Sequence, residues 1–293
     1  MNKENQARWM NVASMAIFGT LAPFVRNISV SSGELALYRA ILAACIIALF
    51  LKLTHQRPTA GGSRRDLILL LLSGMAMGFN WILLFEAYKY TSVANATLSY
   101  YFAPVIVTAM CPILFREKLS RKQLICFVMS TLGIVLITGV GSAGSGRDLI
   151  GILFGLGAAV LYAAVILLNK FIRNTQGIHR TFFQFLSAIA VLIPYVLVTG
   201  GVTLAGMNTL GWICLLIVGF VHTGFAYCMY FSSLKVISGQ QVAILSYVDP
   251  LVAVMISVTL LKEPMGLAQA IGGALILGFT LWNELPEKGK ITH

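Results

Sequence analysis

Two ionisable residues, Asp249 and His222, lie deep inside long apolar stretches of the sequence. Asp249 lies in the stretch at about 239–261 and His222 in the one at about 209–231, each near the middle. A charge so far inside an apolar segment is costly and usually marks a functional site. Because a histidine beside a carboxylate can exchange a proton near neutral pH, the pair predicts a proton-coupled binding site. In the alternative interpretation, His222 is neutral and bonded to a helix carbonyl, and Asp249 satisfies the backbone group freed by Pro250.

Arg39 and Glu86 form a second candidate pair, within the apolar stretches at about 33–52 and 67–88. Together they could form a gate at one end of a path through the protein. They could also bind the carboxylate and the amine of an amino acid. A static ion pair explains the same pattern, because it lets both charges lie at a membrane interface. The sequence leaves these three interpretations open.

A mildly polar face recurs on two of the apolar stretches at helical spacing. Its members are Thr97, Tyr101, Pro104, Thr108 and Cys111 on the first stretch, and Ala243, Tyr247, Pro250, Val254 and Ser257 on the second. We expect the two faces to line a central cavity that is extended by Asn80, Trp81, Tyr100, Tyr162 and Asn169. Aromatic rings there could stack on a flat ligand or hold a cation, although simple packing or interfacial anchoring explains each ring taken alone.

The sequence contains none of the common catalytic or metal-binding motifs. HExxH, GxSxG, a Walker-type phosphate loop and a Cys/His metal cluster are all absent. The five cysteines fall inside apolar stretches without metal-ligand or disulfide spacing. We therefore expect no enzyme activity, no cofactor and no metal, and no direct use of ATP.

The chain is far more apolar than a water-soluble protein of its length. Of its 293 residues, 58% are hydrophobic and 11% are charged, with a mean hydropathy of +0.86. Soluble domains carry about 25% charged residues, so we expect a membrane protein that contacts lipid along most of its length. The net charge of +11 comes from short basic clusters between apolar runs, which is typical of membrane-protein loops and not of a nucleic-acid-binding face.

The apolar stretches predict an all-α integral membrane protein with ten transmembrane helices, since about 20 apolar residues cross a bilayer. The predicted spans lie at roughly 9–27, 33–52, 67–88, 92–115, 121–140, 148–170, 180–199, 209–231, 239–261 and 266–284. Counting Lys and Arg by loop places 16 on one side and 4 on the other. By the positive-inside rule, both termini are then cytoplasmic.

One segment of the first half returns in the second half. Residues 85–117 align with residues 231–263, with a constant offset of 146. The matches include Phe85 with Phe231, Lys89 with Lys235, Ser92 with Ser238, Tyr101 with Tyr247, and Pro104 with Pro250. We therefore divide the chain at the glycine-rich turn into residues 1–143 and 144–293. Five spans in each half make the two repeats inverted.

Two further features of the repeat bear on individual residues. A proline inside each apolar run predicts a bend in the helix at Pro104 and at Pro250, which is tolerated in lipid. Glu117 and Glu263 end their spans beside basic neighbours. We expect these two carboxylates to be structural.

These features resemble those of the drug/metabolite transporter superfamily, and most closely its EamA-like branch. The resemblance rests on the two inverted five-helix halves, the FEAYKYTS motif at residues 85–92, the mid-helix prolines, and the RE and KE pairs that end the repeats. It implies transport of small metabolites, often amino acids, across the bacterial inner membrane and usually outward. The second half departs from the motif at residues 232–234, which leaves open which of its residues contact substrate.

The sequence thus predicts a secondary transporter that exports an amino acid or a related compound by alternating access, as inverted repeats commonly do. Uptake of an organic cation such as a quaternary amine is the alternative within transport, motivated by Glu86, Asp249 and the tyrosines. A membrane-embedded enzyme or receptor is the alternative of another class, and its polar residues should cluster at one membrane face. Substrate, direction, coupling ion and oligomeric state are left open.

Overall fold

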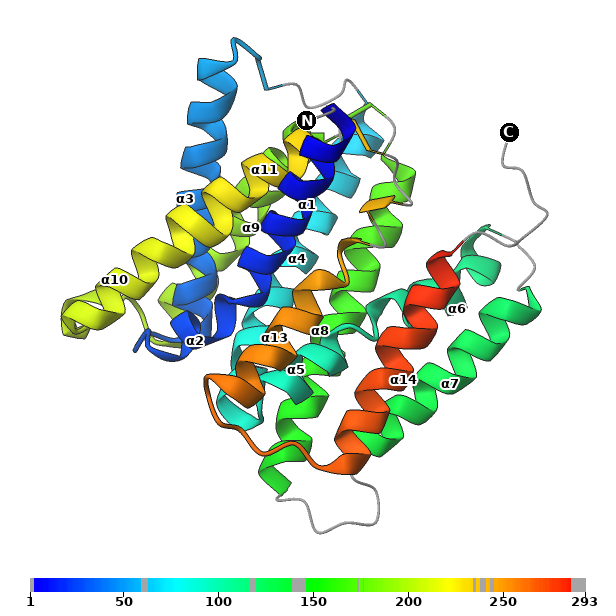
Figure 1. The fold of residues 1–293 in the computed structure, drawn as a ribbon. Helices are drawn as coiled ribbons and strands as arrows, with labels where there is room; N and C mark the ends of the chain where they lie inside the picture. Colours follow the sequence, from blue (N-terminus) through cyan, green and yellow to red (C-terminus); the bar gives the residue numbers. More distant parts are fainter. Residues whose placement is uncertain are drawn as a thin grey trace.

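The computed structural model of the chain describes residues 3–58, 63–115, 120–138, 146–172, 174–175, 177–233, 236–237, 241–242 and 245–285. Over these residues the fold is all-helical and contains no strand (Figure 1). The first half comprises α1 (Lys3–Gly19), α2 (Leu21–Arg26), α3 (Ser32–Leu53), α4 (Arg64–Tyr90), α5 (Val93–Tyr100), α6 (Ala103–Phe115) and α7 (Arg121–Thr138).

The second half is also helical and includes a π-helical segment. Its elements are α8 (Gly146–Phe171), α9 (Gly177–Thr199), the 3₁₀ turn η1 (Leu204–Gly206), α10 (Thr209–Ile217), the π-helix η2 (Val218–Phe225), α11 (Ala226–Ser233), α13 (Val248–Thr259) and α14 (Leu267–Glu284). Helices α10, η2 and α11 follow one another without a break. Each of the ten predicted spans contains helix.

Within the described residues, six segments are long and apolar enough to cross a membrane: Ser32–Leu53, Arg64–Tyr90, Val93–Met110, Gly146–Phe171, Gly177–Thr199 and Thr209–Ser233. Large apolar side chains are exposed on the outside of the bundle, including Leu49, Leu132 and Leu197. Lipid, rather than water, suits such a surface. The fold is that of an integral membrane protein, and the ten crossings in two inverted repeats remain a prediction.

The positions at which we expected bends fall at interruptions of the helix, and each central proline lies at the start of the helix that follows. Helix α5 ends at Tyr100, and Pro104 is the second residue of α6. Pro250 is the third residue of α13, which follows a turn at Ser246–Tyr247. The physical reason is that the first backbone N–H groups of a helix have no intrahelical partner, so a proline there loses no hydrogen bond.

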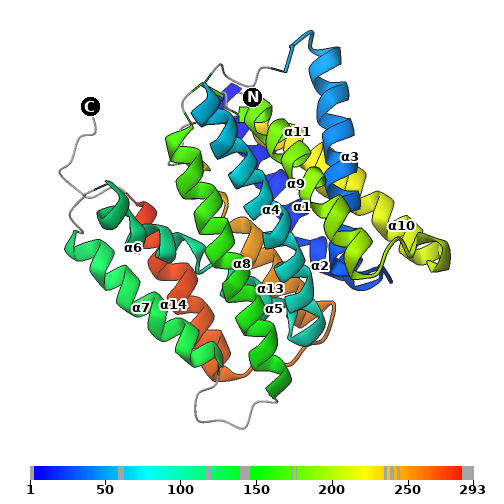
Figure 2. The ribbon, with the colours of Figure 1, turned by 180° about the vertical axis from the view of Figure 1, so that it is seen from behind.

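Helices α4 and α8 pack along each other in the middle of the bundle (Figure 1, Figure 2). Helices α7 and α14 form a pair at one edge, and α3, α9 and α10 lie at the opposite edge in both views. A Cβ atom added to Gly133 of α7 would lie 2.6 Å from the carbonyl oxygen of Gly272 of α14. Glycine thus lets these two backbones approach closely, as is common between membrane helices.

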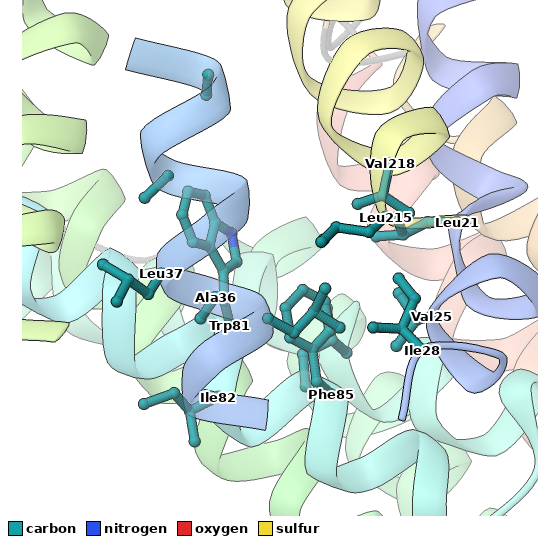
Figure 3. Close-up of a cluster of buried hydrophobic side chains, with 14 of the residues drawn as sticks. Leu21, Val25, Ile28, Ala36, Leu37, Trp81, Ile82, Phe85, Leu215 and Val218 are labelled. Carbon is teal, nitrogen blue, oxygen red and sulfur yellow. The ribbon is translucent and has the colours of Figure 1, made fainter. Parts of the chain in front are cut away.

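The largest cluster of buried apolar side chains lies where α2, α3, α4 and α10 meet (Figure 3). Phe85 of α4 is fully buried within it, near Trp81 on the same helix. Val25 of α2 and Leu215 of α10 belong to the same cluster. The cluster holds in place the helices that carry several of the polar residues described below.

Gly74 of α4 is the site of our first prediction. A Cβ atom added there would overlap the backbone carbonyl of Gln184 and lie 2.5 Å from Cβ of Ser187, both on α9. We expect Gly74→Ala to destabilise the protein by about 1–3 kcal/mol, since α4 and α9 must separate. The measurement is the melting temperature in detergent. Gly278→Ala on α14 is the control, because nothing lies within 4 Å of an added Cβ there; equal melting temperatures for the two variants would contradict the prediction.

Candidate functional site

A cavity of about 500 Å³ lies in the middle of the bundle and is lined by residues from both halves of the chain. Nine of the candidate site residues line it: Arg39, Asn80, Trp81, Tyr100, Tyr101, Pro104, Tyr162, Tyr247 and Asp249. They come from α3, α4, α5, α6, α8 and α13 and from the turns before α6 and α13. Thr97 and Thr108 of the predicted polar face also line the cavity. Its volume is large enough for a small metabolite.

Tyrosine rings form much of the cavity wall. Tyr100 stacks on Tyr162 with ring centroids 5.2 Å apart and meets Tyr101 edge-on at 5.9 Å. Tyr101 in turn lies 6.4 Å from Tyr247, its counterpart in the repeat. Sequence reasoning missed Tyr88, Tyr227 and Tyr230, which also line the cavity. The available indication was the repeat, whose offset of 146 pairs Tyr227 with Trp81.

Asp249 lies in the first turn of α13, with its side chain on the cavity wall. The hydroxyl of Tyr101 donates a hydrogen bond of 2.7 Å to Oδ2. The positive end of the helix dipole favours a carboxylate at this position. Oδ1 has no hydrogen-bond partner among the described residues and is available to a ligand.

Arg39 of α3 lies on the same cavity, with 4% of its surface exposed. Its Nε donates a hydrogen bond of 3.2 Å to Oγ1 of Thr223. The guanidinium carbon lies 5.0 Å from the centre of the Trp81 ring, within cation–π range. Neither Nη atom bonds to a described residue, so both remain available. Among the described residues that line the cavity, Arg39 and Asp249 are those with a formal charge.

His222 lies away from the cavity wall, contrary to our expectation of a pair with Asp249. It is 1% exposed within η2, with Nε2 2.9 Å from Oγ1 of Thr20 and Nδ1 3.4 Å from the carbonyl oxygen of Ile217. The carbonyl oxygen of Ile217 can only accept, so Nδ1 is the donor in that contact. The hydroxyl of Thr20 also donates a hydrogen bond of 2.7 Å to the carbonyl oxygen of Ile17. The imidazole therefore faces the break between α1 and α2. The sequence indicated how deep His222 lies in its span, but not the direction in which its side chain leaves the helix.

The predicted pair of Arg39 and Glu86 does not form in the described structure. Glu86 is bonded instead to Lys89, one turn along α4, with Nζ and Oε1 3.0 Å apart. Both side chains of that pair are partly exposed, whereas Arg39 is buried at the cavity. Pro250 is buried but does not line the cavity. Asn80 lines the cavity and also contacts α8, since its Nδ2 donates a hydrogen bond of 2.6 Å to the carbonyl oxygen of Ala158.

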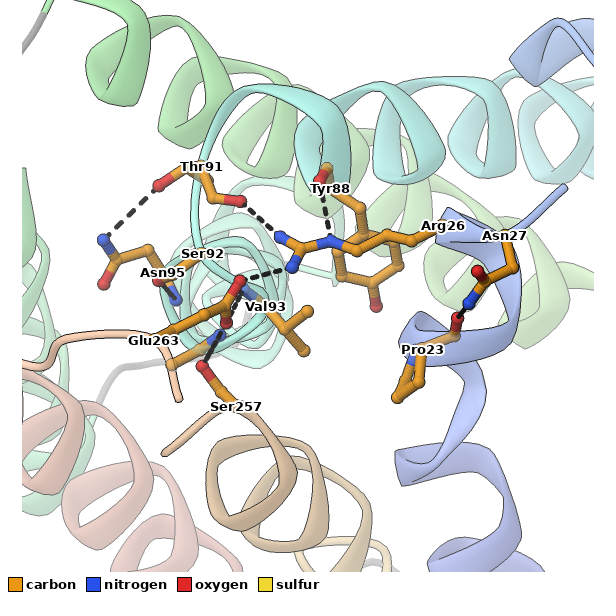
Figure 4. A network of polar contacts seen from close by, with 11 residues as sticks. Pro23, Arg26, Asn27, Tyr88, Thr91, Ser92, Val93, Asn95, Ser257 and Glu263 are labelled. Carbon is orange, nitrogen blue, oxygen red and sulfur yellow. Dashed lines mark hydrogen bonds and ion pairs between the residues drawn. The ribbon is translucent and has the colours of Figure 1, made fainter. Parts of the chain in front are cut away.

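A polar network centred on Arg26 and Glu263 lies at one end of the bundle (Figure 4). Arg26 pairs with Glu263 and also donates to the carbonyl oxygens of Tyr88, at 3.2 Å, and Thr91, at 3.0 Å. We call this region the Arg26 end. Tyr88 links it to the cavity, because its side chain lies on the cavity wall while its carbonyl oxygen accepts from Arg26.

Glu263 also caps the first turn of α5 at the Arg26 end. Its Oε2 accepts hydrogen bonds from the backbone N–H of Val93, at 2.9 Å, and from Oγ of Ser257, at 2.5 Å. A carboxylate is favoured at this end of a helix, where backbone N–H groups lack partners. The expected structural role for Glu263 is thus compatible with these contacts, although the sequence did not reveal Arg26 as its partner. Glu117 lies outside the described residues.

The profile of the EamA-like transporter family matches this chain twice, over residues 7–139 and 149–283. The chain belongs to the EamA-like transporter family. The resemblance to this branch of the drug/metabolite transporter superfamily is thereby confirmed. This EamA-like transporter is a multi-pass membrane protein for a small-molecule substrate, and its family points to transport, not to catalysis.

Several relatives and one solved structure cover nearly the whole transporter. It is 30% identical over 281 residues to the "Uncharacterized transporter YxxF" of Bacillus subtilis, which covers 95% of this chain and 89% of that protein. An "Uncharacterized transporter" of Archaeoglobus fulgidus is 28% identical over 279 residues, with 93% and 95% coverage. The crystal structure of a protein with 16% identity matches with a TM-score of 0.65 and covers 94% of this chain and 95% of that one, which indicates a shared fold.

Proposed function

We propose that this protein is a secondary transporter that exports an amino acid or a closely related zwitterion across the bacterial cytoplasmic membrane. The observation that carries the proposal is the presence of Arg39 and Asp249 on the wall of one cavity. They come from different halves of the chain, carry opposite charges and each keep polar atoms available. The Nη atoms of Arg39 bind the substrate carboxylate, and Oδ1 of Asp249 binds its ammonium group.

The charge balance of the cavity favours a zwitterion over a simple cation. A guanidinium binds a carboxylate through two parallel hydrogen bonds, which a point charge cannot do. A zwitterion satisfies both cavity charges at once, whereas a quaternary amine would satisfy Asp249 and leave Arg39 buried without a counter-charge. Since unpaired charges are costly away from water, the organic-cation alternative is the weaker of the two. The tyrosine rings then surround the substrate's side chain.

We propose alternating access between two inverted five-helix repeats that make up the ten spans. The double match to the family profile supports two copies of one unit. Helix breaks before Pro104 and before Pro250, at equivalent positions of the repeat, support a binding site built from discontinuous helices. With both termini in the cytoplasm, the Arg26 end faces outward. Its network must therefore break when the cavity opens to that side.

Proton coupling enters the proposal through Asp249 alone. One carboxylate holds either a proton or the substrate ammonium group, so the two compete for this site. His222 has no part in this step, since it bonds to Thr20 and Ile217 away from the cavity.

The first experiment measures transport of a mixture of radiolabelled L-amino acids into proteoliposomes, with protein-free liposomes as the blank. We expect at least one amino acid to cross faster in the presence of the protein. Choline and tetramethylammonium, tested in parallel, represent the organic-cation alternative. Transport of these quaternary amines without transport of any amino acid would overturn the proposal.

Asp249→Asn tests the role of the carboxylate in the same vesicles. The amide keeps the size of the side chain but can neither ionise nor attract an ammonium group strongly. We expect at least a tenfold loss of affinity for the transported amino acid, because a hydrogen bond to a charged group contributes about 1.5–3 kcal/mol. We also expect the rate to lose its dependence on pH. A variant with the wild-type rate and the wild-type pH profile would exclude both roles.

A further inference from the structure

We propose that Thr223 is a positioning residue for Arg39, and that the π-helix carrying it determines selectivity for substrates with a carboxylate. This inference rests on the proposed function. Thr223 itself lies outside the cavity lining and is fully buried. It acts through the guanidinium group and does not contact substrate.

The hydrogen bonds of Thr223 give its hydroxyl group a fixed direction. Oγ1 donates its proton to the carbonyl oxygen of Val218 at 2.8 Å. Because a hydroxyl has a single proton, its remaining capacity toward Arg39 is that of an acceptor. It accepts from Nε at 3.2 Å. A carboxylate that meets the guanidinium end-on accepts one hydrogen bond from each Nη atom, and we call this pair of donors the fork. Nε is not part of the fork, so its bond to Thr223 leaves the fork available to a carboxylate.

The bond from Thr223 to Val218 depends on the π-helix. Several other threonine hydroxyls on helices bond to the carbonyl four residues earlier, as in Thr131 to Phe127 at 2.7 Å and Thr259 to Met255 at 2.6 Å. In η2 the hydroxyl reaches the carbonyl five residues earlier, in keeping with the wider turn of a π-helix. A regular α-helix would turn the side chain to a different direction around the helix axis. π-Helical segments are often found at functional sites.

One face of α3 packs directly on this segment. Arg39, Leu42 and Ile46 follow one another at intervals of three and four residues, so they share that face. A Cβ atom added to Gly219 would overlap Leu42, and one added to Gly224 would overlap Ile46. The two glycines of η2 therefore let α3 approach closely enough for Arg39 to reach Thr223.

Trp81 holds the guanidinium from a second direction. The Arg39 guanidinium carbon lies 5.0 Å from its ring centre. Thr223 thus contacts the Nε edge and Trp81 lies against the group, which restricts rotation of a long side chain. Because the side chain of Arg39 is already held in one orientation before the substrate binds, less conformational entropy is lost on binding.

The test compares Thr223→Val with Thr223→Ser. Valine has the shape of threonine but cannot accept from Nε, whereas serine keeps the hydroxyl. Purified variants are titrated with L-amino acids and with the primary amines that lack only the carboxylate, such as L-leucine with 3-methylbutylamine and L-phenylalanine with phenethylamine. Thr131→Val is the matched control, since it removes an intrahelical threonine bond on α7, away from Arg39.

We expect Thr223→Val to weaken amino-acid binding about tenfold, the loss of one hydrogen bond to a charged group, and to leave amine binding within about twofold of wild type. Thr223→Ser should restore the wild-type ratio. Equal losses for the amino acid and its amine, or a serine variant that behaves like valine, would overturn the inference while the proposed function stands. If the wild type binds neither the amino acids nor their amines, the proposed function fails and this inference fails with it. Thr223→Ala, which loses the same bond, replaces the valine variant if that variant does not fold.

Discussion

Arg39→Gln lowers the affinity for the transported amino acid about a hundredfold. Glutamine cannot form two charge-assisted hydrogen bonds with a carboxylate, and their loss corresponds to about 3 kcal/mol. Binding of the matched amine should change far less, because the amine has no carboxylate for Arg39 to hold. The measurement is a titration of the purified variant with the amino acid and with the amine.

Two further variants limit the interpretation of that result. Arg39→Lys keeps the charge but loses the planar fork, so we expect an intermediate loss. Arg8→Gln removes an exposed arginine that pairs with Glu4 on α1, and it should bind like wild type. Equal effects of Arg39→Gln on the amino acid and on the amine would show that Arg39 does not recognise the carboxylate.

Glu263→Gln destabilises the protein by about 2–3 kcal/mol, because the side chain is mostly buried and its charge meets several partners. The substitution removes the negative charge that pairs with Arg26 and that stabilises the first turn of α5. It also weakens the acceptor for the Ser257 hydroxyl. The melting temperature in detergent measures the effect.

Glu86→Gln is the matched control for Glu263→Gln. Glu86 is also a glutamate in an ion pair, but its pair with Lys89 is a neighbouring pair on one helix and both side chains are more exposed. Exposed pairs of this kind contribute about 0.3–0.5 kcal/mol. A melting temperature lowered equally by the two substitutions would mean that the network at the Arg26 end has no special role in stability.

The sequence predicted the cavity residues well where depth and repeat position were sufficient. Tyr101 and Tyr247 are counterparts at the offset of the repeat, and both line the cavity. Helical spacing also placed Thr97 and Thr108 on the cavity side of their helices. These inferences need only two things: how far along a helix a residue lies, and on which face. The regular period of a helix supplies both.

Partners across helices could not be predicted in the same way. His222 has the depth of Asp249, but it lies in a π-helix, whose wider turn changes the direction of each side chain. Arg39 bonds to Thr223 and not to Glu86, since packing around Gly219 and Gly224 decides which helix α3 approaches. The pair of Arg26 and Glu263 joins residues 237 positions apart, and no local pattern indicates such a contact.

The central claim is that the cavity binds both ends of a zwitterion, between Arg39 and Asp249. Its most direct test is the melting temperature of the purified wild-type protein with three matched ligands: an amino acid, the amine that lacks its carboxylate and the acid that lacks its ammonium group. A ligand that binds the folded state raises this temperature, and the rise grows with the logarithm of the ligand concentration divided by its dissociation constant. We predict that, for at least one amino acid, the zwitterion raises it well above either fragment at equal concentration. A rise with the amine or with choline that equals or exceeds the rise with every amino acid would contradict the claim.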